Sequence, residues 1–206
     1  MMPFPALRET DNMRFRLTYD GDLPSVGNSR PPLRVTKVRA IWAVRHAIRP
    51  QLDDLWEHHH LLRGDGGVRV RAAANELRKP IERCGHEFVA IVRPALKLKC
   101  ELSVSMLVNH PPGSPVRGVG DPDNRVKTLV DALRVPKGQQ EFQGATVPPG
   151  LYACLMEDDA AITVLSVTTD RYLACPETSP HWVRLHIGVT VLPAENDFSN
   201  EAFRTD

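Results

Sequence analysis

The sequence predicts an α/β protein of the α+β type, in which a small mixed β-sheet packs against helices. Several short stretches alternate Val, Ile or Leu with polar residues, which is typical of strands with one buried face. Other segments repeat apolar residues at helical spacing. With 206 residues, of which 42% are hydrophobic, the chain can bury one substantial core. We therefore expect a single domain over 1–206, with its core in about 13–193.

The N-terminal half is expected to hold one strand followed by helical segments. Alternation of apolar and polar residues predicts a strand over 13–19, which runs into the turn GDLPSVGN. Loosely helical spacing predicts a helix over 35–48 and a second helical piece over 50–62. Pro50 is expected to kink or divide them. The glycine-rich stretch within 63–70 is expected to be a turn or an inserted loop.

The C-terminal half is expected to add strands around one helix. Enrichment in β-branched residues predicts strands over 86–92, 98–108, 162–169 and 182–192. The irregular segment 134–150 has the composition of an inserted surface loop, because apolar, strand-like chain on both sides belongs to one core. The polar tail, 194–206, is expected to fray.

The segment GDPDNRVKTLVDAL predicts a helix that begins at Pro122. Asp121 is a favourable N-cap, and proline suits the first helical position, where an amide hydrogen would have no helical partner. The apolar residues that follow at helical spacing are Val126, Leu129, Val130 and Leu133. Asp123, Lys127 and Asp131 share an adjoining sector of the helix, so this charged stripe is available to solvent or to a ligand.

The charged stripe also has an ordinary explanation. Lys127 can pair with Asp123 or Asp131, each one helical turn away, and an acidic residue in the first turn stabilises the helix dipole. A second acidic segment, at 157–159, lies just before a predicted strand, where three adjacent acids repel one another unless they are solvated, paired or neutralised by a cation. The combination of an acidic helix start and an acidic strand start favours a functional site.

The pattern D-P-D-N-x-x-K-x-x-x-D-A-L over 121–133, followed by an Asp-Asp pair that opens a strand, resembles the RusA-like Holliday-junction resolvases. The resemblance covers about 119–133 and 156–167, and elsewhere it rests on the order of elements, including an early strand with a Leu-Pro-Ser turn. It implies a RusA-like fold and a Mg²⁺-dependent endodeoxyribonuclease that cuts branched DNA as a homodimer, in recombination and repair. The long segments at 30–83 and 134–154 depart from a compact resolvase.

The resemblance also implies roles for single residues. The implied metal ligands are Asp121, Asp123 and Asp159, with Asp158 as a further ligand. Lys127 would be the catalytic lysine, and Asn124 and Asp131 would support the site structurally, Asp131 by pairing with Lys127. Carboxylates suit the hard Mg²⁺ ion, with Mn²⁺ as an alternative, and no organic cofactor is expected. The lysine would offset negative charge that develops on the phosphate.

Basic residues cluster in one stretch that could contact DNA. The formal net charge is only +1, so any DNA binding must come from an uneven distribution of charge. No acidic residue occurs between Asp22 and Asp53, whereas the basic residues of this stretch include Arg30, Arg34, Lys37, Arg39 and Arg45. A phosphate-contacting surface and a basic helix face paired with acids elsewhere both fit this pattern.

Other features predict a cytoplasmic protein that does not bind zinc or enter a membrane. The histidines at 58–60 cannot all chelate one ion from a helix, and no second Cys/His cluster completes a zinc site. The four cysteines form no C-x-x-C pair, which favours free thiols in a reducing compartment. No segment approaches the ~18 apolar residues of a membrane span, and no signal peptide is evident.

Three functions stay open from the sequence. The first is the nuclease acting on branched DNA. The second is a non-catalytic DNA-binding or structural relative of the same fold, which would bind DNA in a salt-sensitive way without cutting it. The third is a metal phosphohydrolase acting on small phosphate esters, which would ignore long DNA as a competitor.

Overall fold

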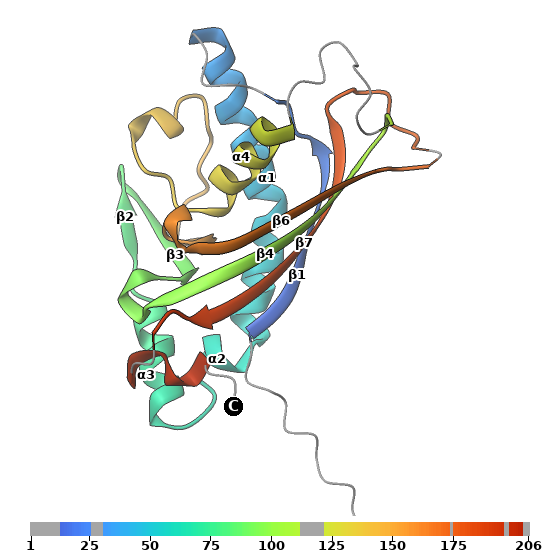
Figure 1. Ribbon diagram of the computed structural model, residues 1–206. Helices are drawn as coiled ribbons and strands as arrows, with labels where there is room; N and C mark the ends of the chain where they lie inside the picture. The colour runs from blue at the N-terminus through green and yellow to red at the C-terminus, as the bar shows by residue number, and fades with distance from the viewer. Residues whose placement is uncertain (1–12, 26–30, 112–121, 174, 196–197, 204–206) are drawn as a thin grey trace, which may run out of the picture.

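The computed structural model of the chain describes residues 13–25, 31–111, 122–173, 175–195 and 198–203. It confirms the α+β class, with two β-sheets packed against helices (Figure 1). The strands are β1 Met13–Asp22, β2 Ile81–Arg83, β3 His86–Val92, β4 Leu98–Val108, β5 Tyr152–Met156, β6 Ile162–Arg171 and β7 Trp182–Pro193. The helices are α1 Pro31–His58, α2 His60–Arg63, α3 Val68–Leu77 and α4 Pro122–Leu133, with 3-10 turns η1 Pro94–Leu96, η2 Gln139–Glu141, η3 Asp159–Ala161 and η4 Phe198–Phe203.

The larger sheet has four strands in the order β1-β7-β4-β6. Strand β7 pairs antiparallel with β1 and β4, and β6 pairs parallel with β4. Side chains alternate between its faces, so that in β4 Leu102 and Val104 are buried whereas Ser103 between them is exposed. Helices α1 and α4 lie on the inner, apolar face of the sheet (Figure 1). The alternation of apolar and polar residues in the sequence therefore indicates which face of the sheet the helices cover.

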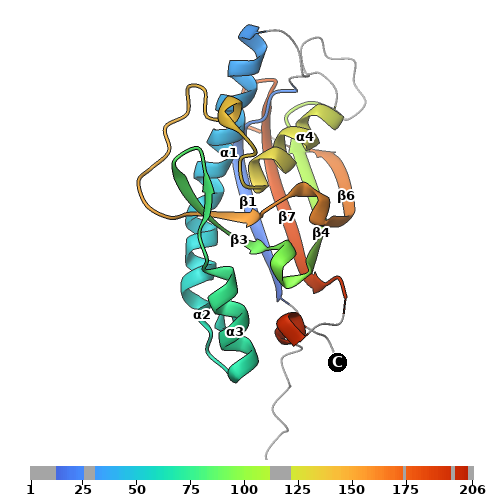
Figure 2. The same cartoon turned by 90° about the vertical axis from the view of Figure 1, so that its left-hand side faces the viewer.

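The smaller sheet has the order β2-β3-β5, with β3 and β5 parallel. These two strands are buried along most of their length, which explains why their sequences are almost continuously apolar. Phe88 and Tyr152 face each other in register and pack with Trp42 of α1 in a second hydrophobic cluster. The β2–β3 hairpin lies across α1 (Figure 2).

Helix α1 is one continuous helix of 28 residues that contains Pro50. Of the two expected effects of Pro50, a kink or a division, the division into two helices was therefore wrong. A proline inside a helix costs about 3 kcal/mol, but Ile48 and Leu52 on either side of Pro50 are both buried in the main core. Burial of both flanks keeps the helix intact. No helix within the described ranges is long and apolar enough to cross a membrane.

Two elements were misjudged from the sequence. The stretch 63–70, expected to be a loop, contains the start of α3, whose N-cap Gly67 has no side chain to mark it. The tail from 194 does not simply fray, because η4 places Phe203 in the core with no exposed surface. Asn200, also buried, donates a hydrogen bond to the Glu195 carbonyl at 2.9 Å. Phe203 and Asn200 thus dock this polar tail.

The inserted segment at 134–150 is held firmly against the protein. Its turn η2 brings Glu141 to α1, where the indole nitrogen of Trp42 donates to the Glu141 carbonyl at 2.6 Å. Phe142 and Val147 pack against the second hydrophobic cluster. The segment is therefore a surface loop, as expected, but one with its own anchors.

The four cysteines are free thiols that should differ sharply in reactivity. Burial raises the pKa of Cys100 and of Cys154 to about 12, whereas Cys84 is exposed. Since only the thiolate reacts, a disulfide reagent at pH 8 is expected to label Cys84 promptly and both buried thiols only after unfolding. Counting thiols with and without guanidinium, in the parent and in Cys84→Ser, checks this. Prompt labelling of Cys154 in the folded protein would contradict the burial.

Candidate functional site

The first half of α4 presents Asp123 and Lys127 to solvent. Both side chains are exposed, and as residues one helical turn apart they share one side of the helix. The other side carries Leu129 and Leu133 into the main core. Asp121 lies outside the described residues. The carboxylate and the amine that the sequence predicts for a metal and phosphate site are thus both accessible at the start of α4.

Buried polar contacts fix the start of this helix. The Arg125 side chain is buried, and its Nη2 donates to the Pro180 carbonyl at 3.0 Å. Burial lowers the pKa of Arg125, and the negative charge of Asp22 offsets only part of this shift. Thr128 Oγ1 donates to the Asn124 carbonyl at 2.9 Å. The helix start is therefore anchored from its inner side, and its charged side is exposed to solvent.

The predicted acidic turn follows β5 directly. The carboxylate of Asp158 accepts a hydrogen bond from the Ala160 amide at 2.8 Å. Lys137 reaches both acids, with Nζ 3.2 Å from Asp158 Oδ2 and 2.6 Å from Asp159 Oδ1. The Ala160 hydrogen bond, followed by Lys137, lowers the pKa of Asp158, and the bond to Asp159 raises the pKa of Lys137. The contact with Lys137, which the sequence left open as one explanation for these acids, offsets one of their two negative charges.

The two acidic segments lie at opposite ends of α4. Asp123 is in its first turn, and at 1.5 Å per residue the helix carries the chain roughly 15 Å before Leu133. Arg134, the next residue, forms a parallel β-bridge with Met156, so the chain leaves α4 alongside the segment that leads to Asp159. In Figure 1 the turn η3 lies beyond the C-terminal end of α4.

This separation bears on the expected metal site, one of whose predicted ligands, Asp121, lies outside the described residues. One Mg²⁺ ion binds oxygens at about 2.1 Å, so carboxylates that share it must nearly touch. The structure does not bring Asp123 and Asp159 together in one copy of the chain. Among the described residues, no group of three or more His, Cys, Asp or Glu side chains could hold a metal ion.

The C-terminal end of α4 carries a buried ionic cluster instead. Arg134 binds both carboxylate oxygens of Glu141, at 3.2 and 3.0 Å, and Asp131 Oδ1 at 2.8 Å. From α1, Arg45 Nη2 donates to the Asp131 carbonyl at 2.7 Å and lies 3.5 Å from Glu141 Oε2. Lys37 pairs with Asp131 at 3.0 Å. Asp131 therefore has a structural role, but with Lys37 and Arg134 and not, as expected, with Lys127.

Arginine pKa values show how far this cluster depends on its carboxylates. Burial lowers the pKa of Arg45. Cys154 and Glu141 act to raise this pKa but offset only part of the shift. Burial also acts to lower the pKa of Arg134, but hydrogen bonds and charge from Glu141 and Asp131 outweigh it and the pKa lies above its ordinary value. Glu141 is the carboxylate common to both arginines.

The predicted DNA-binding stretch on α1 is only partly exposed. Arg45 is 3% exposed and cannot contact a phosphate from solvent, so that prediction was wrong. Residues 37, 41, 45 and 49 share one helix face, and this face packs against α4 and β5. Arg39 is exposed. Arg30 and the side chain of Arg34 lie outside the described part of the chain.

The histidine run sits where α1 ends and α2 begins. His58 Nδ1 lies 2.9 Å from the Asp54 carbonyl. His59 accepts from the Leu61 amide at 3.3 Å and so caps α2, and its ring stacks on His60 at 4.9 Å. The three histidine rings therefore make local contacts at the junction of α1 and α2.

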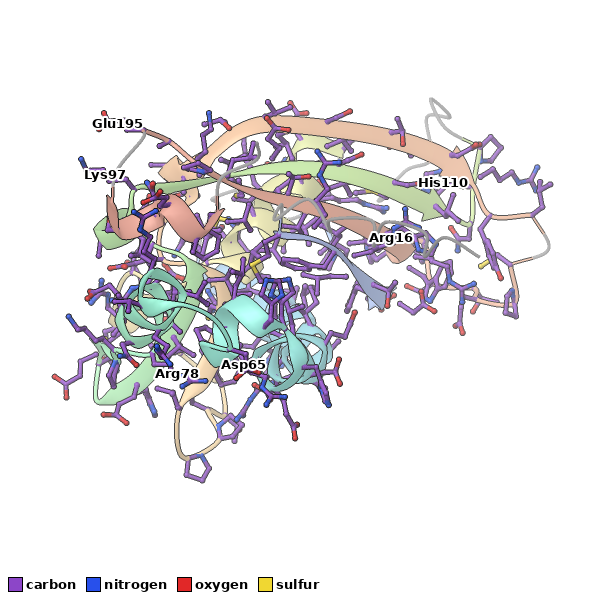
Figure 3. The ribbon with its side chains drawn as sticks, turned by 90° about the horizontal axis from the view of Figure 1, so that it is seen from below. Arg16, Asp65, Arg78, Lys97, His110 and Glu195 are labelled. Atoms are coloured by element: carbon purple, nitrogen blue, oxygen red, sulfur yellow. The ribbon has the colours of Figure 1, made fainter. Side chains whose placement is uncertain are left out.

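An open concavity of about 540 Å³ lies on the outer face of the larger sheet. Arg14 and Arg16 of β1 form one side of it, with Arg16 labelled in Figure 3. Ser103, Ser166 and Thr190 add hydroxyl groups and Glu101 adds one acid, but Phe15, Val164 and Val189 also line the concavity. This surface is therefore of mixed character, and its two exposed arginines can be approached from solvent.

Sequence reasoning missed the residues that hold the end of α4. Arg134 stands three residues after Asp131, a spacing that predicts a helical ion pair. Glu141 and Lys137 gave no such signal, because their partners depend on how the inserted segment folds back. No family model, curated protein or solved structure matches the chain, so the chemistry of the site is argued from its own residues.

Proposed function

We propose that the chain is a Mg²⁺-dependent endodeoxyribonuclease that cuts branched DNA, as the RusA-like resolvases do. The observation that carries the proposal is the exposed pair of Asp123 and Lys127 at the start of α4, within the motif that resembles the family. The opposite side of the helix is anchored in the core, so the exposed side is the one that a ligand can reach.

The chemistry of the helix start suits this ion. Mg²⁺ usually keeps several waters and binds through one or two carboxylates together with substrate phosphates. Asp123, with Asp121 before it in the motif, supplies such carboxylates without Asp159. The bound ion would polarise the phosphodiester and activate a water. Lys127, one turn from Asp123, adds positive charge where the transition state gains negative charge.

Cleavage of a labelled four-way junction beside a matched linear duplex tests the proposal. Incubation with Mg²⁺ is expected to cut the junction, and EDTA is expected to stop the reaction. Cutting of both DNAs alike would keep the nuclease and remove the preference for branches. A protein that cuts neither DNA with Mg²⁺ or Mn²⁺ would overturn the proposed activity.

A DNA-binding protein without catalysis is the second candidate. It is favoured by the position of Asp159, which lies away from Asp123 and is paired with Lys137. Arg14 and Arg16 on the outer sheet face would then contact phosphates. This candidate predicts binding to DNA in EDTA that weakens steeply as salt increases, with no metal-dependent cutting.

A further inference from the structure

Gly188 lies in the middle of β7, a central strand of the larger sheet. A glycine weakens a strand, and in this position it often marks a bulge or a place where a ligand approaches the backbone closely. No bulge is present, because β7 pairs with β1 and β4 in unbroken register around Gly188. A Cβ atom there would lie 3.6 Å from the Ser103 carbonyl oxygen, an ordinary contact, and the φ angle of Gly188 is not in the region that favours glycine. The sheet itself therefore does not require this glycine.

The missing side chain leaves bare backbone as the floor of the outer-face concavity. With a volume of about 540 Å³, this concavity is within the size range of small-molecule sites. Gly188 lies directly between Arg16 of β1 and Ser103 of β4 in the register of the sheet. Arg14 and Thr190 lie opposite each other on the same face, two residues further along. A ligand resting on Gly188 thus meets guanidinium groups on one side and a hydroxyl group on the other.

The two arginines beside Gly188 can both reach such a ligand. Each is exposed, and within the described ranges neither guanidinium forms an ion pair or a hydrogen bond. They are two residues apart on one strand, so both side chains leave the same face. A guanidinium binds phosphoryl oxygens through paired, charge-assisted hydrogen bonds. The corner formed by Arg14, Arg16 and Ser103 therefore suits a phosphoryl group.

The positive charge of this surface is confined to a small area. On the far side of Thr190 from Arg14, β4 places the acid Glu101. Further along β1, Asp20 of the same face is neutralised by Arg184, with Nη2 and Oδ2 2.7 Å apart. A long polyanion gains affinity by neutralising many phosphates with positive side chains, whereas this corner offers only two arginines. Its charges thus favour a compact anion.

We propose that this surface binds a nucleoside monophosphate. The phosphoryl group rests on Gly188 between Arg16 and Ser103, and the sugar and base extend across β4 toward β6. There Ser166 offers a hydroxyl group to the sugar, and Val164, which is 49% exposed, offers an apolar contact to the base. Strand β6 is two strands from β7, roughly 10 Å, a distance that a mononucleotide spans. Helix α4 lies on the other face of the sheet, so this binding does not depend on nuclease activity.

Calorimetric titration in EDTA tests the site without a metal. Adenosine monophosphate is expected to bind with a Kd below about 1 mM. Adenosine and inorganic phosphate should each bind at least about 10-fold more weakly, because each lacks part of the contacts. Arg16→Gln should weaken binding of the nucleotide by about 10-fold or more, since it removes charge-assisted hydrogen bonds. Arg39→Gln, which removes an exposed arginine from α1, is the control and should bind like the parent.

Filling the floor of the concavity gives a sharper test. Gly188→Val should abolish detectable binding of adenosine monophosphate. Its Tm should equal or exceed that of the parent, because a Cβ atom fits there and valine suits a strand better than glycine. Ser105→Val is the matched control, since it adds the same side chain to the same face but outside the concavity. This control should bind the nucleotide like the parent.

Amide NMR spectra locate the ligand and decide the outcome even if Gly188→Val folds poorly. Adenosine monophosphate should shift the amide signals of Gly188 and Ser103 and leave that of Asp123 in place. A parent that does not bind the nucleotide at millimolar concentration, or a folded Gly188→Val that binds it as well as the parent, would overturn the inference. Duplex DNA that displaces the nucleotide at equal phosphate concentration would assign the surface to DNA and contradict a small ligand.

Discussion

Replacing Glu141 with alanine is expected to lower the free energy of unfolding by about 3 kcal/mol. Glu141 neutralises Arg134 through two hydrogen bonds and also lies beside Arg45. Without it, two buried guanidinium groups lose their common carboxylate, and an uncompensated buried charge is costly. For a chain of this size the loss corresponds to a fall in Tm of about 10 °C, which thermal or urea unfolding would measure.

An exposed ion pair supplies the control for this prediction. Lys97 and Glu195 lie 3.3 Å apart near one end of the sheet, where Figure 3 labels both residues. Their side chains are largely exposed, so Glu195→Gln should change stability by less than about 0.5 kcal/mol. If Glu141→Ala were no less stable than Glu195→Gln, the buried cluster would contribute little to the fold.

The variant Asp123→Asn is expected to reduce Mg²⁺-dependent cleavage by on the order of 100-fold or more. Asparagine is well tolerated in a first helical turn but lacks the charge that a hard cation needs. Its Tm should therefore stay close to that of the parent, because the Asp123 side chain is exposed. Initial cleavage rates on the four-way junction, together with thermal unfolding, measure both effects.

Two further variants separate the metal site from general effects. Asp65→Asn removes another exposed carboxylate, between α2 and α3, and should cut DNA like the parent. Lys127→Ala should slow cleavage and leave the Mg²⁺ concentration for half-maximal rate nearly unchanged, because the proposed role of this lysine is to stabilise charge on the phosphate and not to bind the metal. If Asp123→Asn cut as fast as the parent, the metal would have to bind elsewhere.

Local patterns were sufficient for elements whose burial is periodic. The strands at 86–92 and 98–108 have the expected bounds, and α4 occupies the predicted helix from Pro122. The missed helix α3 contributes only two alanines and Leu77 to the buried surface, so its periodicity is weak. The predicted division at Pro50 was wrong because the sequence shows the cost of a proline in a helix but not the tertiary burial that offsets this cost.

The candidate site was predictable only in part. The exposed position of Asp123 and Lys127 follows from helical spacing alone. The burial of Arg45 does not, since a basic helix face looks the same whether it meets solvent or the carbonyl groups that end another helix. The separation of Asp123 and Asp159 likewise depends on the tertiary structure, because the path of the inserted segment determines where β5 lies relative to α4.

The order of strands in the larger sheet also determines when the protein can fold. Among the described residues, β1 pairs only with β7, and their register places Met13 opposite Val191. Strand β1 therefore waits for a partner about 180 residues later in the chain, on the order of ten seconds at ordinary rates of synthesis. The smaller sheet is complete once β5 has been made, whereas the larger sheet cannot close before β7. Such non-local pairing predicts that the larger sheet folds slowly and late.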